Sequence, residues 1–133
     1  MATQPEQILE NQLVKRLKSL EYDYVKIKDE DDLLKNLKIQ IEKHNGLTLT
    51  AREFEQVLNH LNKGNVFERA KTMREKMHLA REDGTSKYIK FINQELWSEN
   101  LFQVTNQVTM EGRYKNRYDV TVLINGLPMV QIE

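Results

Sequence analysis

The sequence predicts an α+β fold in which helices come first and a mixed sheet with a C-terminal β-hairpin follows. Apolar residues recur at helical intervals over most of residues 1–80, whereas residues 85–133 alternate or cluster as strands do. An Asp83-Gly84 turn separates the two patterns, and this segregation favours an α+β domain. The 133 residues, 39% of them hydrophobic, are enough for one domain, 1–133, with its own core.

Four helices are expected before the turn. Thr3 and Glu6 have the spacing of a capping box at the start of the first helix. The stretch "YDYVKIK" is a short candidate strand, and a second helix is expected from about Glu30 to His44. Thr50 and Glu53 form the next capping box, which predicts a third helix. A fourth helix is expected to begin after Asn65 and to run to about Leu79.

The second part reads as strands and loops. "KYIKFI" alternates like a half-buried strand, and "LFQVTNQVTM" is rich in strand-forming residues. Trp97 lies in a short connection between them and is expected to pack in the core with Phe102. "EGRYKN" is a predicted loop, and the final stretch "YDVTVLINGLPMVQIE" is a predicted hairpin.

The register of that hairpin determines where its acidic residues lie. A two-residue turn at Asn125-Gly126 would set Asp119 opposite Ile132 and mix apolar and polar residues on both faces. A three-residue loop, or an equivalent bulge near Pro128, gives one wholly apolar face, and burial strongly specifies register. This register pairs Val122 with Val130, Val120 with Ile132, Thr121 with Gln131, and Asp119 with Glu133. Asp119 and Glu133 then face each other on the more polar side of the sheet.

Two carboxylates this close repel each other unless a cation lies between them. Oxygen ligands suit Mg²⁺, which can orient and activate water for phosphodiester cleavage. Spacing alone also allows both acids to be solvated strand residues.

Composition excludes several other classes of site. The chain has no cysteine, so it has no disulfide framework, thiolate zinc site or cysteine nucleophile. Its 20 basic and 20 acidic residues balance, unlike the excess of positive charge typical of a free-standing nucleic-acid binder. The sequence has neither a membrane-spanning apolar segment nor a secretory signal, which fits a cytoplasmic protein.

The stretch "NRYDVTVLINGLPMVQIE" closely resembles the nuclease motif of the restriction (R) subunit of type I restriction-modification enzymes. That motif is a variant of the PD-(D/E)XK nuclease motif, in which two acidic residues and a lysine form the site. Weaker similarity extends through "NLFQVTNQVTMEG" and "ENQLVKRLKSLEYDYV". The resemblance implies an α/β nuclease-like core sheet flanked by helices, here a truncated PD-(D/E)XK endonuclease-like core.

By position, the resemblance makes Asp119 and Glu133 the metal ligands and sets the motif lysine at the second residue beyond Glu133. The chain is therefore expected to be an N-terminal fragment without nuclease activity of its own. Glu10 resembles an acidic helix residue that supports the metal site in many such nucleases; alternatively, it is a solvated residue or a salt-bridge partner. Three basic residues before Asp119 either contact DNA phosphates or form a solvated turn. They are Arg113, Lys115 and Arg117.

The family resemblance also implies the activity of the parent protein. Such a protein cuts double-stranded DNA with Mg²⁺ after ATP-driven translocation, through a motor region that this chain lacks. Its partners would be specificity and methyltransferase subunits, in a bacterial or archaeal cytoplasm. Two alternatives remain: a non-catalytic domain that docks other subunits, and another PD-(D/E)XK nuclease, such as a repair or junction-resolving enzyme.

Overall fold

The computed structural model describes residues 4–64, 66–110 and 116–132, and it confirms the α+β class. Within these residues, four α-helices accompany a four-stranded mixed sheet and a separate two-stranded sheet. The chain divides into two compact units. We call Met1–Leu37 with Phe102–Glu133 the sheet unit, and Lys38–Leu101 the hairpin unit. No helix of the described residues is long and apolar enough to cross a membrane.

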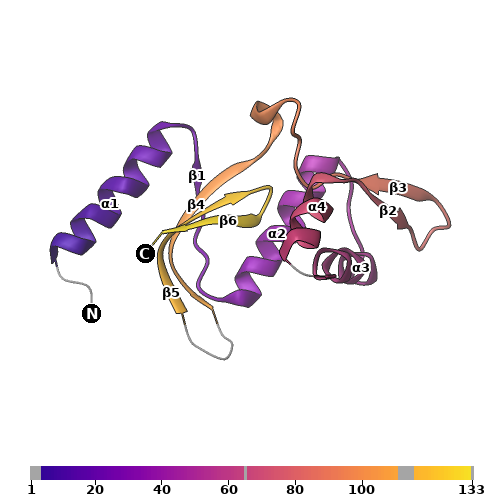
Figure 1. Cartoon of the computed structure of the whole chain (residues 1–133), viewed down its shortest axis with the longest axis horizontal. Coiled ribbons are helices and arrows are strands. Elements are labelled where there is room, and N and C mark those ends of the chain that lie inside the picture. Colours follow the sequence, from indigo (N-terminus) through magenta and orange to yellow (C-terminus); the bar gives the residue numbers. More distant parts are fainter. Residues whose placement is uncertain (1–3, 65, 111–115, 133) are drawn as a thin grey trace. The chain divides into compact units, whose positions relative to one another are not determined.

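The sheet unit is built around four strands in the order β1-β4-β5-β6 (Figure 1). The short β1 pairs with β4 in parallel, and the other neighbours are antiparallel. Its elements are α1 (Gln4–Ser19), β1 (Asp23–Tyr24), the first part of α2 (Glu30–Asn45), β4 (Phe102–Met110), β5 (Asn116–Ile124) and β6 (Leu127–Ile132). The "YDYVKIK" strand therefore exists but is only two residues long, and the second helix lies where the sequence predicts it.

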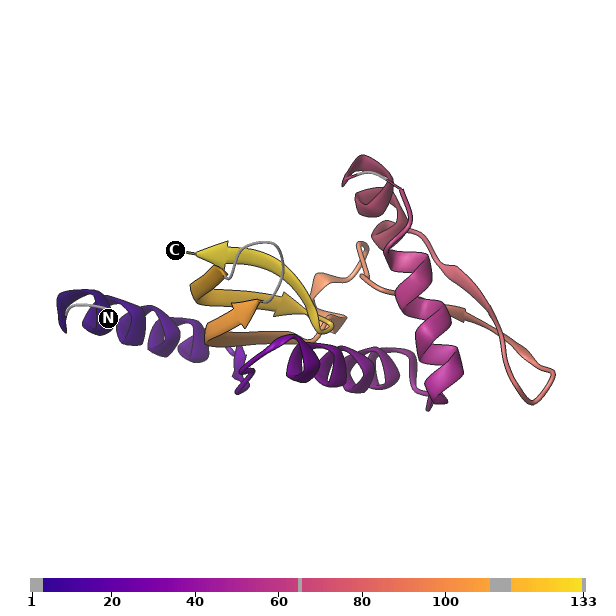
Figure 2. The ribbon, with the colours of Figure 1, turned by 90° about the horizontal axis from the view of Figure 1, so that it is seen from below.

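Helices α1 and α2 contact opposite faces of this sheet. Asn36 of α2 exchanges two side-chain hydrogen bonds with Gln103 of β4, at 2.8 and 3.2 Å. Glu10 of α1 accepts a hydrogen bond from Asn106 of the same strand. Because positions 103 and 106 differ by an odd number, they lie on different faces of the strand. Figure 2 gives a second view of these helices and strands.

The central strands of the sheet are buried on both faces, and the α2 face is the more polar one, as expected, since it carries Gln103, Thr105 and Thr121. Leu123 packs with Ile27 and Leu33 on the α2 face and is fully buried. On the α1 face, Val120 is 1% exposed, whereas Val130 of the edge strand β6 is 49% exposed. Strands covered on both sides read as nearly continuous apolar runs, as "VTVLI" does here.

The hairpin unit combines helices with a small antiparallel sheet. Thr50 caps α3 through the predicted capping box, in which its hydroxyl and the Glu53 carboxylate each accept a backbone N–H. The unit contains the second part of α2, α3 (Ala51–Leu61), α4 (Val66–Arg74), β2 (Met77–Ala80), β3 (Ser86–Ile89) and the 3₁₀ turn η1 (Trp97–Glu99). The sheet pairs β2 with β3.

Two expectations for this unit are wrong. The fourth helix ends at Arg74, because Met77 and Leu79 belong to a strand that pairs with β3. Both side chains are buried while their neighbours in β2 are exposed. Burial therefore alternates every second residue, as in a strand, and does not follow the helical period. Trp97 is not a core residue, since it is 52% exposed. Phe102 packs instead against Tyr22, with ring centroids 5.3 Å apart.

Candidate functional site

The β5–β6 hairpin combines a two-residue turn with a bulge. Asn125 and Gly126 have φ of 52° and 85°, as a tight hairpin turn requires, and Ile124 pairs with Leu127. The three-residue loop is therefore wrong. The register then shifts between Val122 and Leu123, as a bulge does. Beyond the shift, the pairs are Val122 with Val130, Thr121 with Gln131 and Val120 with Ile132. The alternative of a bulge near Pro128 is confirmed, together with these three pairs; the predicted pair of Asp119 with Glu133 lies outside the described residues.

The two predicted metal ligands lie at the end of this ladder. Asp119 directly precedes Val120 in β5, but its side chain is outside the described part of the chain, and so is the whole of Glu133. The last described pair is Val120 with Ile132. Within the described residues, no group of three histidine, aspartate or glutamate side chains could hold a metal ion. The structure thus fixes the backbone ladder that leads to the acids.

Glu10 is part of a buried polar network and is not a solvated helix residue. It is 6% exposed, and its Oε1 accepts a 2.9 Å hydrogen bond from Asn106 Nδ2. Tyr24 donates its hydroxyl to Asn106 Oδ1 at 2.6 Å. Since a carboxylate can only accept, the amide of Asn106 must turn its nitrogen toward Glu10. Asn106 also pairs with Val120, so this network reaches the strand position next to Asp119.

The predicted phosphate contacts cannot be placed in the same way. Arg113 and Lys115 lie outside the described residues. Arg117 belongs to β5, where it pairs with Thr109, but its side chain is outside the description.

Two threonine hydroxyls that the sequence did not point to are buried in the central strands of the sheet. Thr105 of β4 and Thr121 of β5 are direct cross-strand partners and are 0% and 2% exposed. Among the described residues, neither hydroxyl has a hydrogen-bond partner. The signal in the sequence was that Thr121 lies two residues from Asp119 in the same strand. Only the packing of α2 shows that this face is buried.

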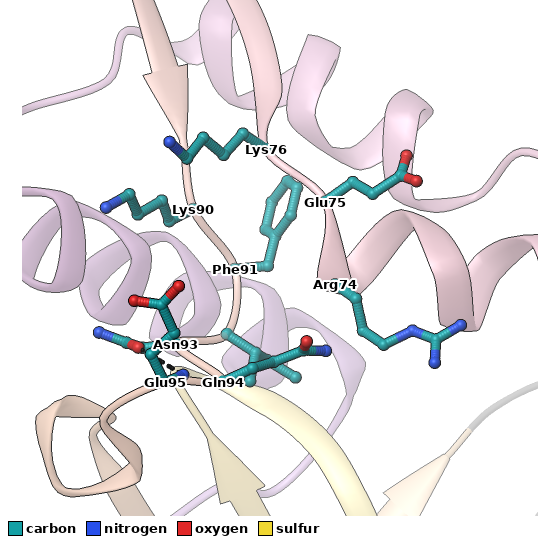
Figure 3. Close-up of a pocket in the computed structure, with 9 residues that line it drawn as sticks. Arg74, Glu75, Lys76, Lys90, Phe91, Asn93, Gln94 and Glu95 are labelled. Carbon is teal, nitrogen blue, oxygen red and sulfur yellow. Dashed lines mark hydrogen bonds between the residues drawn. The ribbon is translucent and has the colours of Figure 1, made fainter.

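A cavity of about 280 Å³ lies in the hairpin unit, and no predicted site residue lines it (Figure 3). Lys76 and Lys90 project in the same direction from neighbouring segments, and Phe91 lies between these lysines and Arg74. Glu75 and Glu95 also line it, and the Glu75 carboxylate points away from Phe91 (Figure 3). Three basic residues, two acidic residues and the buried Phe91 thus line this cavity.

The most buried ion pair among the described residues also belongs to the hairpin unit. Arg81 Nε donates to Glu53 Oε2 at 3.0 Å, and the Glu53 side chain is 1% exposed. The hydrogen bond from Arg81, helped by the N–H of Thr50, lowers the pKa of Glu53 to about 2. Arg81 also donates to the carbonyl of Thr48. These contacts fasten β2 to the start of α3, which is a structural role.

Comparison with known sequences gives a match over nearly the whole chain. Residues 3–133 match the family described as the type I restriction enzyme R protein N terminus.

Individual relatives agree with that match. The endonuclease subunit of the type I restriction enzyme SauMSSORF170P from Staphylococcus aureus (strain MSSA476) is 44% identical across the whole chain. The corresponding subunit of SsaAORF53P from Staphylococcus saprophyticus is 45% identical, also across the whole chain. The endonuclease subunit of EcoprrI from Escherichia coli is 30% identical over 98% of this chain and 44% of its own length. The chain spans only 15% of the two staphylococcal relatives.

Proposed function

Because the chain belongs to the family of type I restriction enzyme R protein N termini, we propose that it forms the first part of a PD-(D/E)XK nuclease domain. The observation that carries this proposal is the bulged register of β5 and β6. If the ladder continues by one residue beyond Val120 and Ile132, it pairs Asp119 with Glu133. A hairpin without the bulge would set these two acids on opposite faces.

The donor set fits a divalent cation. Two carboxylates on neighbouring strands supply oxygen ligands alone, which Mg²⁺ prefers, and the cation offsets their mutual repulsion. In this proposal Asp119 and Glu133 hold Mg²⁺, which when bound activates water for phosphodiester cleavage. Glu10 would support the site from the opposite face of the sheet, through Asn106 and its strand partner Val120, which precedes Thr121 and follows Asp119 in β5. Arg113, Lys115 and Arg117 contact DNA phosphates. A lysine two residues beyond Glu133 would stabilise charge on the attacked phosphate.

The parent protein, in this proposal, is the endonuclease subunit of a type I restriction-modification enzyme. It cuts double-stranded DNA with Mg²⁺ after ATP-driven translocation, and it assembles with specificity and methyltransferase subunits. The staphylococcal relatives, which are named as endonuclease subunits, support this assignment.

The test uses the full-length subunit assembled with its partner subunits, and measures cleavage of a plasmid that carries the recognition site. Asp119→Asn and Glu133→Gln should each lower cleavage on the order of 100-fold or more, with ATP hydrolysis unchanged. Glu55→Gln, an exposed residue of the hairpin unit, is the matched control and should cut normally. Wild-type cleavage by both site variants would refute the assignment of the acids. Mg²⁺-dependent nicking by the pure 133-residue chain would refute its expected inactivity.

A further inference from the structure

The buried threonine pair belongs to a row of residues that are partners across neighbouring strands, close in the ladder to the positions of the proposed acids. Thr105 and Thr121 are cross-strand partners, and Thr121 pairs on its other side with Gln131 of β6. The row therefore crosses β4, β5 and β6. Side chains two residues apart along a strand share a face. Position 119 lies two residues before Thr121 in β5, so it is on the same face of the sheet, the one that α2 contacts.

The two hydroxyls contrast with the other polar groups of that face. Asn36 and Gln103, further from the acids, satisfy each other with two hydrogen bonds. Thr105 Oγ1 and Thr121 Oγ1 are equally buried but have no hydrogen-bond partner in the described residues. Buried hydroxyls are nearly always satisfied, by protein or by an ordered water. Cross-strand partners have Cβ atoms about 5 Å apart, so one water can bridge both hydroxyls.

We propose that Thr105 and Thr121 are positioning residues of the metal site, whose paired hydroxyls hold an ordered water that serves the proposed metal ligand Asp119, two residues from Thr121 in β5. This inference rests on the proposed function, because it takes Asp119 as a metal ligand. The water donates to a carboxylate oxygen and fixes the direction in which the other oxygens point. Ligating carboxylates are commonly hydrogen-bonded in this way, and loss of such a partner typically weakens metal binding 10–100-fold.

The test separates this role from simple packing. Thr105→Val/Thr121→Val keeps the shape of both side chains and removes only hydroxyls that no described protein group satisfies. We expect the melting temperature to stay the same or rise, and the affinity for Mn²⁺, measured by calorimetry on the 133-residue chain, to fall at least about tenfold. Thr105→Ser/Thr121→Ser restores both hydroxyls and should keep the affinity of wild type.

The matched control replaces a valine by threonine on the opposite face of the same strands. Val122 is the cross-strand partner of Val104 and is 8% exposed. Val122→Thr should lower the melting temperature, because it buries an additional hydroxyl, and should leave Mn²⁺ affinity unchanged.

Each remaining outcome is decisive. If Asp119→Asn abolishes Mn²⁺ binding while the double valine variant binds as wild type does, the threonine role is overturned and the metal site stands. The same holds if the double valine variant only lowers the melting temperature, or if the serine variant loses as much affinity as the valine variant. If wild type binds no Mn²⁺, or Asp119→Asn binds it normally, the metal site is overturned and the inference falls with it.

Discussion

Replacing Glu53 by glutamine tests the buried ion pair that organises the hairpin unit. Glu53 Oε1 accepts from the N–H of Thr50 at 2.8 Å and from Arg81 Nη2 at 3.2 Å. Its Oε2 accepts from Arg81 Nε at 3.0 Å and from the N–H of Glu82 at 3.2 Å. Glutamine keeps one oxygen, so Glu53→Gln retains two of these hydrogen bonds and turns an NH₂ group toward two buried donors.

The size of the effect follows from those contacts. A hydrogen bond to a charged group contributes about 1.5–3 kcal/mol. The Arg81 side chain is 18% exposed, so water screens it partly and the lower value applies. Two lost bonds then reduce the free energy of unfolding by about 3 kcal/mol, which corresponds to a fall of about 10 °C in melting temperature. Circular dichroism at pH 7 measures this, with the exposed Glu55→Gln as control, which should change stability by less than about 0.5 kcal/mol.

The pH dependence of this stability difference tests whether the charge of Glu53 causes it. Because the pKa of Glu53 falls from its ordinary 4.5 to about 2 on folding, its contribution to stability is complete above pH 4.5. That contribution is lost as the pH falls through 2, when the folded carboxylate takes up its proton. The wild type and Glu53→Gln should therefore differ at pH 7 and become alike as the pH falls below 2. An undiminished difference below pH 2 would show that the charge of Glu53 is not what stabilises the unit.

Three further changes test other parts of the structure. Gly126→Ala places a side chain at φ 85° and should lower the free energy of unfolding by about 1–2 kcal/mol in a urea titration; no loss would argue against the tight turn. Asn36→Leu and Gln103→Leu should each destabilise the sheet unit by about 1–3 kcal/mol, but the double variant should lose less than their sum, and simple additivity would contradict the paired amides. Glu10→Gln keeps an acceptor for Asn106, so it should retain its melting temperature while lowering cleavage by the full-length subunit about tenfold; normal cleavage would leave Glu10 a structural residue.

Local features were predictable from the sequence because short-range contacts determine them. The capping box at Thr50 depends on a residue three positions away, and the structure reproduces it. The hairpin register was also predictable, because the alternation of apolar residues in β5 and β6 admits one arrangement with an apolar face. The turn itself was wrong, since the extra residue is accommodated by a bulge instead of a longer loop.

Features that depend on distant partners were not predictable. Met77 and Leu79 continue the apolar pattern of the preceding helix, and only pairing with β3 makes them a strand. The contact of Glu10 with Asn106 joins residues 96 positions apart. The burial of Thr105 and Thr121 depends on α2 packing over a face that the sequence marks as the more polar one. The sequence pattern therefore pointed to the acids of the candidate site, but not to the buried polar groups around them.

Paramagnetic broadening by Mn²⁺ tests the metal site most directly. In a nuclear magnetic resonance titration of the ¹⁵N-labelled chain, the ion broadens the amide signals nearest to where it binds. If Asp119 and Glu133 bind the ion, broadening should begin at the β5–β6 ladder around Val120 and Ile132, spare the hairpin unit, and disappear in Asp119→Asn. Broadening that centres on the hairpin unit, or that persists at the ladder in Asp119→Asn, would contradict the claim that Asp119 and Glu133 form a divalent-cation site.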